Sequence, residues 1–183
     1  LKDKFILIVS LAGLTLTGCL EMELKVQPNH AAVGSTFSAT NEVVQTNNSG
    51  SRTMLYAVQK PEDWTINSVT FTSPQQANGT LSYLGNGSDA SLTESSGIDE
   101  GWEDSLTANY PPAEGSHWAV YMSDAAATSS ASEESPDTFH VTVEYTVGNN
   151  EGNYNLEYWV SYDSNDNPTS AENTSHSAGP VTA

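Results

Sequence analysis

The segment 138–147, TFHVTVEYTV, alternates strictly: its odd-numbered residues are apolar or aromatic and its even-numbered residues are polar. The segment 154–162, YNLEYWVSY, repeats the pattern, with its even-numbered residues on the apolar face and Trp159 on the other face. A period of two over this length is typical of a β-strand with one buried face. The residues between, 148–153, are rich in Gly and Asn, which tolerate positive φ. The sequence therefore predicts that these two strands pair as a hairpin.

Six shorter segments also carry β-branched or aromatic residues between Gly, Pro, Asn and Ser, and no segment has the period of an amphipathic helix. In the first of them, Met22, Leu24 and Val26 are expected to face inward. Seven or eight short strands predict an all-β fold, an antiparallel Ig-like β-sandwich, with a jelly roll as the alternative. The six segments are 22–28, 36–46, 53–60, 67–73, 80–84 and 117–123.

Three polar segments are expected to lie outside the strands. The acidic, small-residue segment 123–137 predicts a mobile loop, and 87–105 has a similar composition. The segment 164–183 is polar and predicts a C-terminal tail or linker. The expected organisation is thus a leader at 1–18, a sandwich domain at 19–163 and the tail.

The N-terminal segment 5–16 is almost entirely apolar. About 12 helical residues span only ~18 Å, which is less than the ~30 Å hydrocarbon core of a bilayer. Lys2 and Lys4 precede the run and small residues follow it, an order typical of a secretory signal peptide. The sequence therefore predicts a signal peptide at 1–18 and not a membrane-spanning helix.

The apolar run is followed by Leu16, Thr17, Gly18 and Cys19. This tetrapeptide resembles the lipobox of bacterial lipoproteins, in which a cysteine follows one aliphatic and two small residues. The resemblance implies that a peptidase cuts before Cys19, that its thiol carries a diacylglycerol, and that acyl chains hold the protein on a membrane. The next residue is Leu20 and not Asp, which by the sorting pattern of such lipoproteins implies the bacterial outer membrane.

The predicted first strand begins only three residues after Cys19. At ~3.3 Å per residue, the sandwich would lie within about 10 Å of the lipid headgroups. The alternative is that the chain up to Gly34 is a flexible tether. These two geometries differ in whether residues 22–28 are paired in a sheet.

The chain is strongly acidic, with a net charge of −18 from 23 acidic and 5 basic residues. Loss of residues 1–18 removes two lysines and one aspartate and leaves a net charge of −19. Nucleic acids and anionic lipid surfaces attract clustered Lys and Arg, so neither is an expected partner. Salt screens the self-repulsion of such a chain, which favours a saline setting, although secreted polar proteins are often acidic. Because Cys19 is the sole cysteine, no disulfide can form within the chain.

The sequence contains no recognisable catalytic pattern. It has no Gly-x-Ser-x-Gly motif, and its four histidines have no metal-ligand spacing. Adjacent acids such as Glu62 and Asp63 follow from the acidic composition and do not indicate a glycosidase pair. The sequence therefore predicts a protein that is not an enzyme.

In DSNDN, Asp163, Asn165 and Asn167 offer oxygen ligands at alternate positions, a pattern that is typical of calcium-binding loops. The segment lacks the glycine and the twelfth-position glutamate of an EF-hand loop, since position twelve is Thr174. A polar loop at a strand end is the alternative interpretation. No other cofactor is predicted.

Two tryptophans are candidates for ligand binding. Trp159 lies on the polar face of its predicted strand, and Trp102 lies in an acidic segment. Exposed indoles beside carboxylates and amides suit stacking on a sugar ring. Packing against a loop or a sheet edge is the alternative for Trp159.

The segments 60–71 and 110–123 resemble parts of Ig-like modules in secreted bacterial proteins. Together with the lipobox, they imply a membrane-anchored, non-catalytic β-sandwich lipoprotein with a structural or adhesive role, facing the cell surface or the periplasm. The alternative is a glycan-binding lipoprotein that assists polysaccharide capture and uptake. The expected partners are the membrane, through Cys19, and either a glycan or another cell-surface protein.

Overall fold

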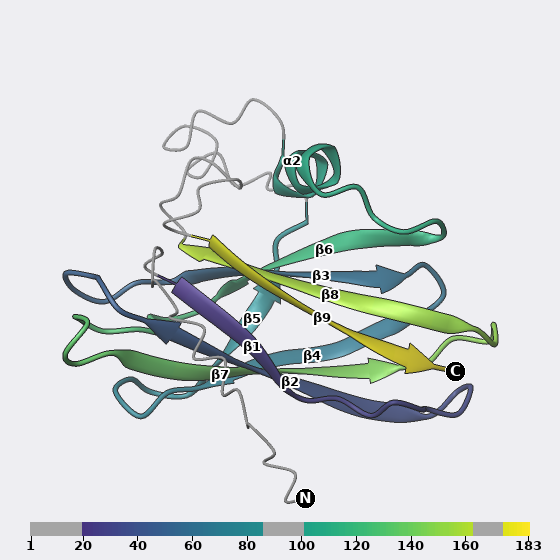
Figure 1. Ribbon diagram of the computed structural model, residues 1–183, viewed down its shortest axis with the longest axis horizontal. Coiled ribbons are helices and arrows are strands. Elements are labelled where there is room, and N and C mark those ends of the chain that lie inside the picture. The colour runs from purple at the N-terminus through teal and green to yellow at the C-terminus, as the bar shows by residue number, and fades with distance from the viewer. Residues whose placement is uncertain (1–19, 86–100, 163–173) are drawn as a thin grey trace, which may run out of the picture.

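The structure is a computed structural model that describes residues 20–85, 101–162 and 174–183. Within these ranges the chain forms nine strands and one helix, arranged as an antiparallel β-sandwich (Figure 1). The all-β prediction is confirmed, with one strand more than expected. The elements are β1 (Leu20–Val26), β2 (Thr36–Gln45), β3 (Met54–Pro61), β4 (Thr65–Thr72), β5 (Gly79–Tyr83), α2 (Trp102–Asn109), β6 (Ser116–Ser123), β7 (Asp137–Thr146), β8 (Asn153–Tyr162) and β9 (Thr174–Thr182).

The two layers of the sandwich are joined through β5. One layer has the strand order β1-β2-β7-β4 and the other has the order β6-β3-β8-β9. The first residues of β5 pair with β4 and its last residues pair with β6. On the opposite side β1 lies beside β9, where the main-chain N–H of Met22 donates to Oγ of Ser175 at 2.9 Å. The sandwich is therefore almost closed into a barrel.

The core lies between the two layers and is formed by the apolar faces that alternation predicts for β7 and β8. Three tyrosines meet there. The hydroxyl of Tyr145 donates to that of Tyr158 at 3.3 Å, and the amide of Asn41 donates to the hydroxyl of Tyr56 at 2.7 Å. Burial raises the pKa of Tyr56 and Tyr145 well above the ordinary value, so both stay neutral hydrogen-bonding groups.

The predicted hairpin of 138–147 with 154–162 is wrong. β7 pairs with β2 and β4, whereas β8 pairs with β3 and β9, so the two strands lie in opposite layers. The connection crosses the end of the sandwich, where a carboxylate oxygen of Asp63 accepts the N–H groups of Asn149 and Asn150 at 2.9 and 3.1 Å. Alternation identifies the buried face of a strand but not its neighbour in the sheet.

The predicted C-terminal tail is also wrong, because β9 pairs antiparallel with β8 from Thr174 to Thr182. The sandwich domain therefore extends past residue 163. β9 lacks the alternation of the central strands, and Val181 is its one buried large apolar residue among those described. Its proline, Pro180, fits a strand at the end of the sheet order, where one edge needs no ladder hydrogen bond.

The polar segment 123–137 connects β6 and β7 as a loop between strands, as predicted, and it is packed against the domain. Main-chain hydrogen bonds join Ala131 to Asn48 and Thr128 to Arg52. Ala127 and Thr128 are buried. The loop thus closes the end of the sandwich at which β2 ends and β7 begins.

β1 begins at Leu20, whose main chain lies opposite Gln45 of β2. Paired residues directly after position 19 exclude the tether interpretation for 20–26. Met22 is buried and Leu24 is half-buried, as predicted, but Val26 is 58% exposed. The register shifts between Leu24 and Val26, which turns the Val26 side chain outward.

The helix α2 was not predicted. It covers the outer surface of the layer that contains β6, β3 and β8 (Figure 1). Trp102 and Leu106 are four residues apart and lie on the buried side of the helix. A second apolar cluster forms beneath them, and Nε1 of Trp118 donates to the carbonyl of Tyr110 at 2.8 Å.

Candidate functional site

Trp102 and Trp159 are not exposed, so the expectation that they form a sugar-stacking surface is wrong. They are 2% and 1% exposed, and their ring centroids lie 5.6 Å apart between α2 and β8. The physical reason is that α2 covers the face of β8 that alternation assigned to solvent. Both indoles are part of the second apolar cluster and serve to hold the helix on the sheet.

The other candidate residues of the sequence lie outside the described residues: Cys19 with its lipobox, and Asp163, Asn165 and Asn167. Over the ranges that the structure covers, His, Cys, Asp and Glu side chains form no group of three that could hold a metal ion. In the same ranges, no helix combines the length and the apolar character needed to cross a bilayer.

A cleft of about 520 Å³ opens where β5 is too short to fill the space between β4 and β6. β4 has eight residues, but only Thr70 and Phe71 pair with β5. The first residues of β4 and of β6 therefore face each other across an open seam. The described lining residues are Lys60, Trp64, Thr65, Ile66, Asn67, Ser68, Val69, Leu81, Tyr83, His117, Ala119 and Tyr121.

One end of the cleft is formed by two tyrosines. The rings of Tyr83 and Tyr121 meet edge to face with centroids 5.5 Å apart, and Tyr83 is 63% exposed. The Tyr83 hydroxyl donates to Oε1 of Glu103 at 3.0 Å, and the same oxygen accepts the N–H of Val120 at 3.3 Å. Glu103 belongs to α2, so the buried helix positions the exposed ring. Burial raises the pKa of Tyr121 to about 12, which keeps its hydroxyl a neutral donor.

The other end of the cleft carries Lys60 and His117, which are cross-strand neighbours on β3 and β6. Nζ of Lys60 donates to the carbonyls of Trp64 at 2.7 Å and Pro61 at 3.2 Å, so this ammonium group holds the turn after β3. Partial burial lowers the pKa of Lys60, and partial burial and then Lys60 lower the pKa of His117. Since an ordinary histidine titrates at about 6.5, His117 is neutral at pH 7 and can both donate and accept.

The wall formed by β4 is polar at its surface and apolar beneath. Thr65, Asn67 and Ser68 are exposed, whereas Val69 is buried in the core. The amide of Asn67 is fixed by a carboxylate oxygen of Glu144 at 3.1 Å. Hydroxyls, an amide, an imidazole and aromatic rings thus line one cleft, and no carboxylate is among its described lining residues. This composition suits the binding of a polar ligand.

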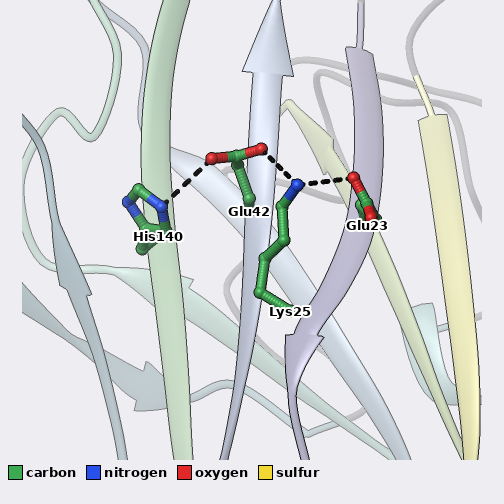
Figure 2. A network of polar contacts seen from close by, with 4 residues as sticks. All are labelled: Glu23, Lys25, Glu42 and His140. Atoms are coloured by element: carbon green, nitrogen blue, oxygen red, sulfur yellow. Dashed lines mark hydrogen bonds and ion pairs between the residues drawn. The ribbon is translucent and has the colours of Figure 1, made fainter.

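A separate polar network lies on the outer face of β1, β2 and β7, as Figure 2 shows. Nζ of Lys25 lies 2.5 Å from a Glu23 oxygen and 2.9 Å from Oε1 of Glu42, and Nε2 of His140 lies 3.2 Å from Oε2 of Glu42. The hydrogen bond from Lys25 is the largest cause of the lowered pKa of Glu42. His140 is on the polar face, as alternation predicts. The network links three strands and its partners satisfy one another, so it is a structural feature.

Sequence reasoning missed the cleft residues Lys60, Tyr83, His117 and Tyr121. A signal was present in HWAVYMS, because His117, Ala119 and Tyr121 alternate on one face while the residues between them are also apolar. Such a strand has both faces covered. What the pattern does not contain is the shortness of β5, which leaves the His117 face open.

The structure defines an all-β sandwich domain with an aromatic-rimmed cleft at a seam of its sheet. In sequence, the chain belongs to the family described as "Domain of unknown function (DUF4961)", which matches residues 14–180. No curated protein matches the chain in sequence.

Among solved structures, the chain is similar to a cohesin module of a family 33 glycoside hydrolase from Clostridium perfringens, with 13% identity, 91% of this chain and 97% of the other covered, and a TM-score of 0.47. It is similar to AvmM, which catalyses macrocyclization in alchivemycin A biosynthesis, with 8% identity, 90% and 88% covered, and a TM-score of 0.47. It is also similar to the adhesin Fhb of Streptococcus suis bound to the disaccharide receptor Gb2, with 10% identity, 90% and 88% covered, and a TM-score of 0.40. At these identities and scores, the similarities say nothing about what this chain binds or does.

Proposed function

We propose that the protein is a non-catalytic, lipid-anchored binding module of the bacterial outer membrane whose seam cleft holds a neutral saccharide. The observation that carries the proposal is the exposed ring of Tyr83 at the end of a cleft of about 520 Å³. An aromatic face packs on the C–H face of a sugar ring, and the hydroxyls and amide of the β4 wall suit the sugar hydroxyls.

Charge favours a neutral ligand over an anionic one. Lys60 is the sole Lys or Arg among the described lining residues, and two of its N–H groups are directed at main-chain carbonyls. Glu62, Asp63 and Glu103 act electrostatically on the groups of the cleft. An acidic sugar would therefore meet more negative than positive charge.

The position of β1 sets the orientation that the cleft would have on an anchored protein. Leu20 pairs with Gln45, which in turn pairs with Asp137 at the start of β7. Thr65 pairs with Thr146 at the other end of β7. If Cys19 carries the lipid, the membrane faces the Leu20 end of the sandwich. The half of the cleft that contains Lys60 and His117 then points away from the membrane, where a saccharide can reach it.

A structural or adhesive role through a protein partner is the second candidate. The seam edges of β4 and β6 favour it, because residues 65–69 and 116–119 pair with no strand on that side among the described residues. An extended peptide could add to either edge. The two candidates differ in which probe binds.

A glycan array with the exported protein tests the saccharide proposal. We expect Tyr83→Ala to weaken binding by about tenfold or more, and Tyr83→Phe to weaken it less because the ring is kept. His140→Ala, on the outer face of the sheet, is the matched control and should bind normally. An absence of binding to every neutral glycan on the array would refute the saccharide proposal and favour the protein partner.

Metabolic labelling with a palmitate analogue tests the anchor separately. The wild type should incorporate the label and sediment with membranes, whereas Cys19→Ser should do neither. An unlabelled wild type would refute the anchor without affecting the cleft.

A further inference from the structure

Three buried side-chain oxygens near the Leu20 end of the sandwich have no hydrogen-bond partner among the described residues. They are Oε1 of Gln45, Oγ1 of Thr128 and Oδ1 of Asp137. Gln45 and Thr128 are fully buried and Asp137 is 2% exposed. Buried polar atoms are nearly always hydrogen-bonded, and an ionised carboxylate is the costliest of them to bury alone. Each of these atoms therefore requires a partner.

Ser129 links these three residues. Gln45 and Asp137 are direct cross-strand partners on β2 and β7. Nε2 of Gln45 donates to the Ser129 carbonyl at 3.1 Å, and the N–H and hydroxyl of Ser129 donate to Oδ2 of Asp137 at 2.7 and 3.1 Å. Thr128 precedes Ser129, and its main chain is bonded to that of Arg52. Nε2 of Gln45 and Oδ2 of Asp137 are thus already hydrogen-bonded. Oε1 of Gln45 and Oδ1 of Asp137 remain as acceptors without a donor among the described residues.

The partner has to offset negative charge. No described Lys, Arg or His forms an ion pair with Asp137. The loop from Asp124 to Asp137 also contains Glu133 and Glu134 and has no basic residue. A water molecule could donate to two acceptors, but it leaves the charge uncompensated; a metal cation satisfies both requirements.

We propose that Gln45, Thr128 and Asp137 form a site for a hard cation, calcium or sodium. Hard cations are held by carboxylate, carbonyl and hydroxyl oxygens, which is the set present here. Calcium takes about six to eight oxygens, so main-chain carbonyls and water complete the shell. With a single carboxylate the affinity is low, in the roughly 10⁻⁴–10⁻³ M range of extracellular calcium modules. The site shares no residue with the saccharide cleft or with DSNDN.

Thermal unfolding of the exported protein, after treatment with a chelator, tests the site. Choline chloride, sodium chloride and calcium chloride are compared at equal ionic strength, so that Debye screening is matched, and the Asp137→Asn protein controls for cations bound elsewhere on the acidic surface. At ten times the dissociation constant, the bound cation should raise the melting temperature by about 3–6 °C above choline. The salt that raises the melting temperature above the value in choline chloride identifies the cation. Equal melting temperatures in all three salts would overturn the proposal.

Two variants and a control locate the effect. Asp137→Asn should abolish the rise in melting temperature above that in choline chloride (the excess), and Thr128→Val should weaken cation binding several-fold. Glu134→Gln removes the same charge from an exposed residue of the same loop and should keep the full excess. An Asp137→Asn protein that keeps the excess, or that is more stable than the wild type in every salt, would refute a cation in favour of water or a proton. If Asp137→Asn does not fold, Thr128→Val and a calorimetric titration of the wild type decide.

Discussion

Replacing Trp159 with alanine should destabilise the fold and should not remove a ligand site. The indole is 1% exposed and lies between β8 and α2, 5.6 Å from Trp102. Its Nε1 has no hydrogen-bond partner among the described residues, so the substitution removes packing and no hydrogen bond within that part of the chain. Deleting a buried aromatic side chain in this way costs about 3–5 kcal/mol.

The short helix places the expected cost near the lower end of that range. α2 has eight residues, too few to be stable alone in water, and is held mainly by Trp102 and Leu106. When the Trp159 indole is lost, the helix can detach locally, which limits the penalty to the free energy of its docking. We therefore expect a loss of about 3 kcal/mol, or roughly 6–12 °C in melting temperature for a chain of this size.

Urea unfolding followed by circular dichroism measures this loss. Trp159→Phe should fall between the alanine variant and the wild type. Tyr83→Ala, at an exposed ring, should cost less than about 1 kcal/mol. A loss below about 1 kcal/mol for Trp159→Ala, combined with loss of saccharide binding, would refute the packing role and show that the indole contacts the ligand.

Three further predictions concern the sheet and its charge. Gly79→Ala should destabilise the fold by about 1–3 kcal/mol in urea unfolding, because a Cβ would lie 2.6 and 2.8 Å from ring atoms of the buried Phe71; an unchanged midpoint would contradict the contact. Because Lys25 lowers the pKa of Glu42, the carboxylate stabilises the fold above its unfolded pKa and loses that effect as pH falls through the lowered value. Lys25→Met should raise the Glu42 pKa toward its unfolded value in an NMR titration and reduce the stability that is lost on acidification, whereas an unshifted titration would refute the pairing. Raising sodium chloride from low to molar concentration should raise the melting temperature by screening a net charge of −18, and a flat response would show that the acids are too dispersed to repel.

The sequence predicts the buried faces well because alternation is a local property of each strand. The inward face of β7 is buried as expected, and the apolar run of β3 corresponds to a strand covered on both faces. Strand pairing is not local. The Gly- and Asn-rich segment 148–153 suits a hairpin and a crossover equally, and the choice depends on which layers the other strands occupy.

The site was harder to predict for a related reason. Trp159 looks exposed by its position in the strand, and it is buried because α2 packs on that face. α2 is too short to show a helical period in the sequence. Tyr83 and His117 look like ordinary strand residues, and they line a cleft because β5 ends early. Both effects depend on tertiary packing, which the sequence pattern does not encode.

The saccharide cleft is tested most directly by NMR titration of the labelled protein with the neutral saccharide that binds best on the array. We expect amide shifts to concentrate at Tyr83, His117 and Tyr121, with none at His140 on the outer face. They should saturate with one saccharide per chain and be lost in Tyr83→Ala. Shifts that centre on another surface, or a complete absence of shifts at millimolar saccharide, would contradict the assignment of the cleft.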